Sequence, residues 1–107
     1  MSARPATAAA EQAATSSRPR LVFFYSERSG KSRRAEGFLA QVLQRRQNHN
    51  TFDLVRVSVD QRPDLARKFR IDQVPTLCVI EDHCLRKRIA APRGCRQLES
   101  ELAAWLH

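Results

Sequence analysis

A strand pattern, a helical apolar stripe and a second strand pattern follow one another within residues 21–59. The continuous apolar and aromatic run from Leu21 to Tyr25 is typical of a strand buried on both faces. After a break at Gly30, apolar residues recur at helical spacing: Ala35, Phe38, Leu39, Val42 and Leu43. A second strand is expected over residues 54–59. Because a strand–helix–strand order requires a right-handed crossover and a parallel strand pair, the chain is constrained to an α/β fold.

A short helix is expected after the second strand. Asp60 is the candidate N-cap, and Pro63 falls in the first turn, where a missing N–H costs nothing. The helix would bury Leu65, Ala66 and Phe69.

Two strands and a helix complete the chain. Residues 76–80 and 85–90 are predicted strands, and the short link 81–84 makes them an antiparallel hairpin. A C-terminal helix would bury four residues: Leu98, Leu102, Trp105 and Leu106. The predicted order is β-α-β-α-β-β-α, which gives one layered α/β domain with a mixed four-stranded sheet flanked by helices.

The first 20 residues differ from the rest. Residues 1–20 hold seven alanines with Ser, Thr and Pro, and Met1 is their only large apolar residue. We therefore predict a disordered tail over 1–20 and a folded domain over 21–107. The tail lacks the apolar core of a secretory signal. It is acid-poor and loosely similar to an organelle transit peptide, but the amphipathic arginine spacing is absent.

Composition excludes several classes of protein. No apolar run approaches the roughly 18 residues of a membrane-spanning helix. The three cysteines are too few for a disulfide-stapled scaffold, and neither they nor the three histidines show a metal-ligand spacing, so we expect a cytoplasmic protein without a metal. The net charge of +8 favours polyanions such as nucleic acid. Since sixteen of the nineteen basic residues are arginine, a GC-rich genome would explain the same charge without a binding role.

Two motifs lie at the ends of predicted elements. Ser29-Gly30-Lys31-Ser32 opens the long helix, and Val74-Pro75-Thr76 precedes the third strand. This arrangement resembles the thioredoxin-like family, in which Cys-Gly-Pro-Cys stands at the helix start and a cis-proline loop leads into the third strand. The resemblance covers about residues 21–106 and implies a thioredoxin fold.

The departures from the family pattern bear on chemistry. Ser29 and Ser32 stand where the family has its two redox cysteines, and a serine hydroxyl cannot form or resolve a mixed disulfide. The resemblance also places Arg28 at the family's tryptophan, Lys31 at its motif proline and Phe23 at its buried acidic residue. Dithiol reductase activity is therefore not expected from this motif, and no cofactor is implied.

What the resemblance then implies is a binding or adaptor module. Its surface would be the groove that holds the active site in the family, and its partner an extended or acidic protein segment docked by edge pairing. Ser29 suits an N-cap, and Pro75 a cis bond that shapes the loop. The candidate groove residues are Tyr25, Arg28, Ser29, Gly30, Lys31, Ser32, Val74 and Pro75.

A single-thiol function is the first alternative. Cys78 lies inside a predicted strand and is expected in the core, and Cys84 lies in the hairpin turn. Cys95 starts the last helix beside Arg93 and Arg96, and should return toward the Ser29 end of the sheet. A helix start and nearby arginines favour a thiolate, so Cys95 is the candidate reactive thiol. Because Cys84 and Cys95 should lie at opposite ends of a strand, no disulfide is expected between them.

Anion or nucleic-acid binding is the second alternative. Lys31, Arg33 and Arg34 crowd the start of the long helix, where free N–H groups also favour anions. The simpler interpretation is a solvated basic face. A phosphate loop is not expected, because Tyr25 stands where that motif needs a glycine. Aromatic residues that could stack on bases do not interleave with the basic runs.

Overall fold

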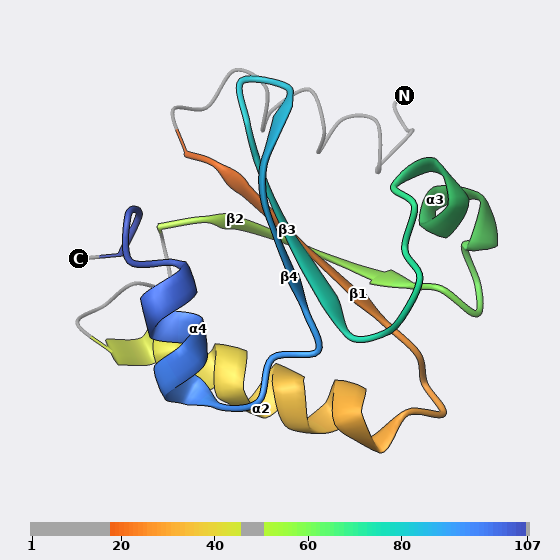
Figure 1. Cartoon of the computed structure of the whole chain (residues 1–107), viewed down its shortest axis with the longest axis horizontal. Coiled ribbons are helices and arrows are strands. Elements are labelled where there is room, and N and C mark those ends of the chain that lie inside the picture. Colours follow the sequence, from red (N-terminus) through yellow and green to blue (C-terminus); the bar gives the residue numbers. More distant parts are fainter. Residues whose placement is uncertain (1–17, 46–50, 107) are drawn as a thin grey trace, which may run out of the picture.

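The computed structural model describes residues 18–45 and 51–106. The predicted order of elements is confirmed (Figure 1), and the bounds lie close to the expected ones except at the last helix, which ends earlier. Of the predicted tail, residues 1–17 lie outside the described residues, whereas Arg20 is already the first residue of a strand. In chain order the elements are β1 (Arg20–Tyr25), α2 (Gly30–Gln44), β2 (Asp53–Ser58), α3 (Pro63–Lys68), β3 (Thr76–Glu81), β4 (Cys84–Ala90) and α4 (Cys95–Glu101).

The four strands form one mixed sheet in the order β2-β1-β3-β4. β1 pairs with β2 in parallel and with β3 antiparallel, so that Phe23 lies opposite Arg56 on one side and Leu77 on the other. β3 and β4 form the expected antiparallel hairpin. Its turn residues Asp82 and His83 have φ values of 54° and 66°, the positive values that a two-residue hairpin turn requires.

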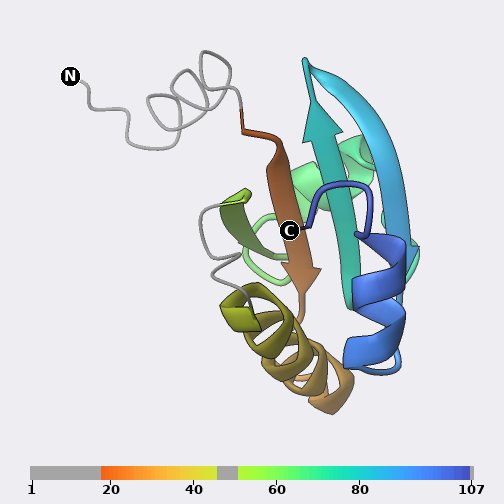
Figure 2. The same ribbon diagram turned by 90° about the vertical axis from the view of Figure 1, so that its left-hand side faces the viewer.

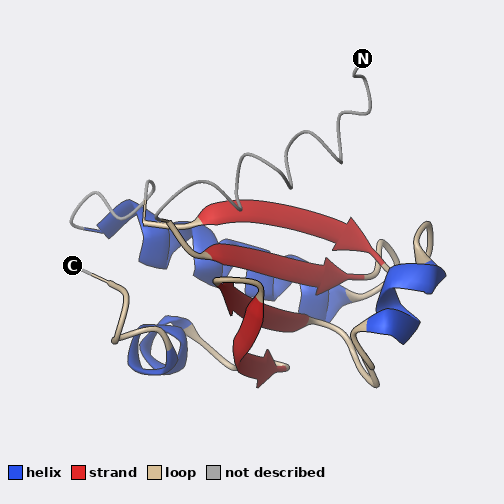
Figure 3. Cartoon of the chain, turned by 90° about the horizontal axis from the view of Figure 1, so that it is seen from above, coloured by secondary structure: helices blue, strands red, loops and turns tan. Residues whose placement is uncertain are grey.

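Helices cover both faces of the sheet. α2 and α4 lie side by side in front of it and α3 lies behind it (Figure 2), with α3 and α4 at opposite ends (Figure 3). Leu21 and Phe23 of β1 face α2 and α4, whereas Val22 and Phe24 face α3. All four side chains are at most 4% exposed, so the interpretation of β1 as a strand buried on both faces is confirmed.

The expected role of Asp60 is wrong. α3 begins after Arg62, and no side chain caps it. The carboxylate of Asp60 instead accepts hydrogen bonds from the hydroxyl of Ser26 at 2.9 Å and the N–H of Glu27 at 3.0 Å. The reason lies in the sheet: β1 and β2 are parallel neighbours, so the loops that follow them leave the same edge and meet.

The last helix is shorter than its apolar spacing suggests. α4 ends at Glu101, and Leu102 follows as its C-cap. Leu98 and Leu102 are fully buried, as expected. Trp105 and Leu106 pack against the same core from the turn beyond the helix, with the Trp105 ring 6.3 Å from that of Phe52.

Candidate functional site

The two serines at the start of α2 hold the helix end together. The Ser29 hydroxyl oxygen accepts the N–H of Ser32 at 3.1 Å, so the predicted N-cap is confirmed. The Ser32 side chain is 2% exposed, and its oxygen accepts the N–H of Ser26 at 3.2 Å. Ser32 is therefore buried and leaves no surface for contact with a docked partner, although the sequence placed it among the candidate groove residues.

Replacing either serine should lower stability. Ser29→Ala removes a cap and is expected to cost about 1 kcal/mol in the free energy of unfolding. Ser32→Ala leaves the Ser26 N–H without its acceptor and is expected to cost about 1–3 kcal/mol. Urea unfolding followed by circular dichroism measures both, with the exposed Ser100→Ala as the control. Losses no larger than that of the control in both variants would contradict the capping roles.

The loop before β3 contains a residue, Val74, whose backbone groups have no partner among the described residues. The Val74–Pro75 peptide bond is cis. The carbonyl of Pro75 accepts the N–H of Ala91 at 2.7 Å, and the Thr76 hydroxyl donates to the carbonyl of Gln73 at 2.8 Å. Within the part of the chain that the structure describes, the N–H and C=O of Val74 have no hydrogen-bond partner. One donor and one acceptor at the entry to the strand thus lack a partner among the described residues.

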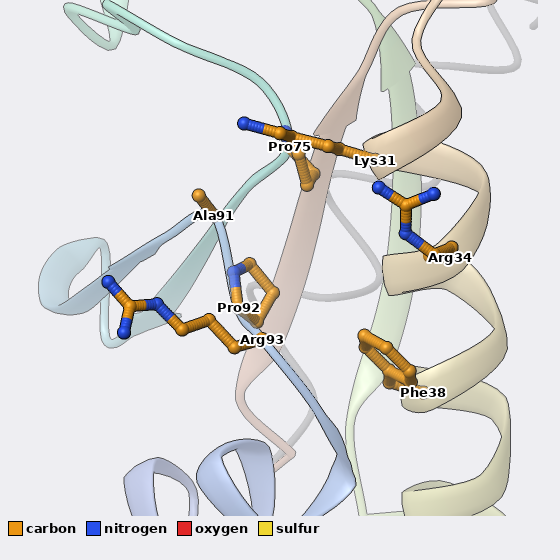
Figure 4. A pocket seen from close by; sticks show the side chains of 7 residues that line it. All are labelled: Lys31, Arg34, Phe38, Pro75, Ala91, Pro92 and Arg93. Carbon is orange, nitrogen blue, oxygen red and sulfur yellow. The ribbon is translucent and has the colours of Figure 1, made fainter.

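A cleft lies beside this loop, between α2 and the segment that joins β4 to α4 (Figure 4). Its volume is about 390 Å³. In Figure 4, Lys31 extends from α2 across to Pro75, and the guanidinium of Arg34 lies at the same opening, while that of Arg93 points away from α2. We call this space the basic cleft; its lining residues are Lys31, Arg34, Phe38, Pro75, Ala91, Pro92 and Arg93.

Only part of the expected groove is assembled at the basic cleft. Lys31 and Pro75 line it, but Arg28 does not, and Tyr25 lies elsewhere. The Tyr25 ring stacks on Phe23 at 5.6 Å, and the guanidinium of Arg56 lies 5.0 Å from its centre. Tyr25 is therefore held on the α2 face of the sheet by packing.

Of the three residues of the expected cationic cluster, only two line the basic cleft. Lys31 and Arg34 are three residues apart and share one face of α2, whereas Arg33 is not part of the cleft lining. Helical spacing alone separates Arg33 from the other two. Sequence reasoning did not find the opposite wall at residues 91–93, because it depends on the register of β4 against β3.

The three cysteines are free thiols. Cys78 is fully buried in β3, as expected, and this burial raises the pKa of its thiol, opposed by the charge of Arg88. Cys84 is exposed in the hairpin.

Cys95 lies against the middle of α2. Its sulfur is 3.0 Å from the side-chain carbonyl oxygen of Gln41 and 3.7 Å from the backbone carbonyl of Phe38. Both neighbours are acceptors, so the thiol acts here as a donor, and its reactivity stays a prediction.

The described part of the chain, residues 18–45 and 51–106, contains no group of three or more His, Cys, Asp or Glu side chains that could hold a metal ion. It also contains no helix with the length and apolarity needed to cross a membrane.

Comparison with known proteins agrees with this architecture. The family model for thioredoxin matches residues 5–105. A thioredoxin from Mycolicibacterium smegmatis is 30% identical over 88 residues, which cover 82% of this chain and 79% of that protein. Trxlp from Edwardsiella tarda shares the fold at a TM-score of 0.77 and 22% identity, covering 87% of this chain and 89% of its own. Mitochondrial thioredoxin 3 from Saccharomyces cerevisiae shares the fold at a TM-score of 0.74 and 20% identity, covering 92% of this chain and 89% of its own. The chain therefore belongs to the thioredoxin family.

Proposed function

We propose that this chain is a thioredoxin-family module that binds extended protein segments without dithiol chemistry. The observation that carries the proposal is the backbone of Val74, whose N–H and C=O have no partner among the described residues. A docked segment in extended conformation would supply one acceptor and one donor there, as in edge-strand pairing. Pro75 and the basic cleft lie directly beside it.

The serines at the start of α2 support a binding role over a catalytic one. Exchange of disulfides requires a thiolate that attacks sulfur, and neither Ser29 nor Ser32 can supply it. The hydroxyl oxygens of both already accept backbone N–H groups at the helix start. The cysteine closest in sequence to the cleft lining, Cys95, directs its thiol at two carbonyl oxygens of α2.

A random decapeptide library displayed on phage and selected against the purified full chain tests the proposal. Selected peptides are then synthesised and titrated into isotope-labelled protein. We expect the amide resonance of Val74 to be among those that move most. N-methylation of the peptide residue that pairs with Val74 should weaken binding about tenfold, because it removes one hydrogen bond and leaves the Val74 carbonyl unpaired.

The same peptide methylated at the next residue is the matched control, since that N–H points away from the paired edge and its loss should change affinity little. Failure to enrich any peptide would overturn the proposal. The proposal would also be overturned if an enriched peptide binds without shifting the Val74 amide resonance and all of its methylated versions bind equally well.

A further inference from the structure

We propose that the basic cleft selects its segments by an acidic side chain, a glutamate or aspartate that Lys31 and Arg34 hold beside Pro75. This inference rests on the proposed function, because the cleft adjoins the free backbone of Val74.

The charge around the cleft is one-sided. Three of its lining residues are cationic and none is acidic. Among the described residues, Lys31, Arg34 and Arg93 form no ion pair. Several cations elsewhere are neutralised at close range, for example Arg56 by Glu36 at 2.8 Å. A partner carboxylate is therefore the group that this lining lacks.

The position of the two cations favours one bound side chain over diffuse attraction. Lys31 and Arg34 lie one turn apart at the start of α2, where positive side chains oppose the helix dipole and an anion between them would offset that cost. An arginine fork binds a carboxylate through two parallel hydrogen bonds. Phe38 and the buried Pro92 also line the cleft, and the half-buried ring of Phe38 offers apolar surface that suits the stem of a glutamate.

The cleft is less suited to a nucleic acid strand. Bases bind single-strand sites by stacking on exposed aromatic rings, and the one aromatic ring in this lining, Phe38, is half-buried against the core. The occupant that we propose is therefore an acidic protein segment, and competition by nucleic acid would contradict it.

Arg33 provides a matched control for Arg34. Both are exposed arginines of the first turns of α2 without an ion pair, and only Arg34 lines the cleft. Arg33→Gln and Arg34→Gln therefore change the net charge equally. The probes are a selected decapeptide that carries one glutamate and its twin with glutamine at that position.

We expect the wild-type chain to bind the glutamate peptide about tenfold more tightly than its twin, since hydrogen bonds to charged groups are the stronger ones. Arg34→Gln and Lys31→Gln should remove most of this preference, and Arg33→Gln should retain it. Moving the glutamate by one residue along the peptide should also remove it, because successive side chains point to opposite sides. A peptide with lysine in place of the glutamate should bind the Arg34→Glu variant more tightly than it binds the wild type.

Three results would overturn the inference. If the two peptides bind equally and both still shift the Val74 amide resonance, the acidic preference is rejected and the proposed function is retained. Equal losses in Arg33→Gln and Arg34→Gln would indicate attraction by net charge. Displacement of the glutamate peptide by a thymidine dodecanucleotide, again equally sensitive to both variants, would indicate a polyanion surface. If neither peptide binds, the proposed function itself has failed.

Discussion

Purified protein is expected to reduce the disulfides of insulin no faster than dithiothreitol alone. The rate of a dithiol reductase depends on a nucleophilic thiolate and a second thiol that resolves the mixed disulfide. Ser29 and Ser32 provide neither at the start of α2, and the sequence contains no Cys-x-x-Cys pair. The measurement is the turbidity of the precipitating insulin B chain over time.

A dithiol reductase with a Cys-x-x-Cys pair, assayed alongside, serves as the positive control for the conditions. Cys95→Ala is the informative variant, because Cys95 is the thiol that the sequence singles out as reactive. Activity above the dithiothreitol blank that disappears in this variant would contradict the expectation, place the chain among thiol enzymes and name its nucleophile. Activity that persists in Cys95→Ala would point to Cys84, the exposed thiol of the hairpin.

Features that depend on neighbouring residues alone were predicted correctly from the sequence. The cap at Ser29 needs only a hydroxyl three residues before the N–H that it accepts. The burial of β1 on both faces follows from a run without polar residues. The same local logic failed at Asp60, which is well placed for a cap but is engaged by the loop after β1. A carboxylate binds whichever donors the fold brings closest.

The site could be predicted only on one of its sides. The sequence named Lys31 and Arg34, but it grouped them with Arg33, which does not line the cleft. The opposite wall of the cleft could not be predicted, because it follows from the pairing of Thr76 with Ala90, which carries Ala91 to the carbonyl of Pro75. Such a register depends on the whole sheet. Tyr25 was misplaced for a related reason, since its ring is drawn to Phe23 and Arg56.

The largest loss of stability is expected from Phe23→Asp. The family resemblance places Phe23 at the position of a buried acidic residue, and in this chain the side chain is fully buried under α2 and α4. Truncating a buried phenylalanine costs about 3–5 kcal/mol, and an unpaired carboxyl group adds the cost of burying its polar atoms. Against a total stability of about 5–15 kcal/mol, the variant should be largely unfolded or close to it. Urea unfolding of the variant and the wild type measures the difference.

Phe23→Leu is the control, because it shortens the side chain without adding a polar group and should cost clearly less. The pH dependence separates charge from lost packing. Burial should raise the pKa of the introduced carboxyl group above the ordinary value of about 3.9, so the folded variant binds a proton that the unfolded chain has released. Its deficit relative to Phe23→Leu should therefore shrink as the pH falls from neutral toward about 4, since protonation restores the uncharged form. A deficit that is independent of pH would contradict this account, because it would indicate that the carboxylate reaches water and that Phe23 does not lie in a closed core.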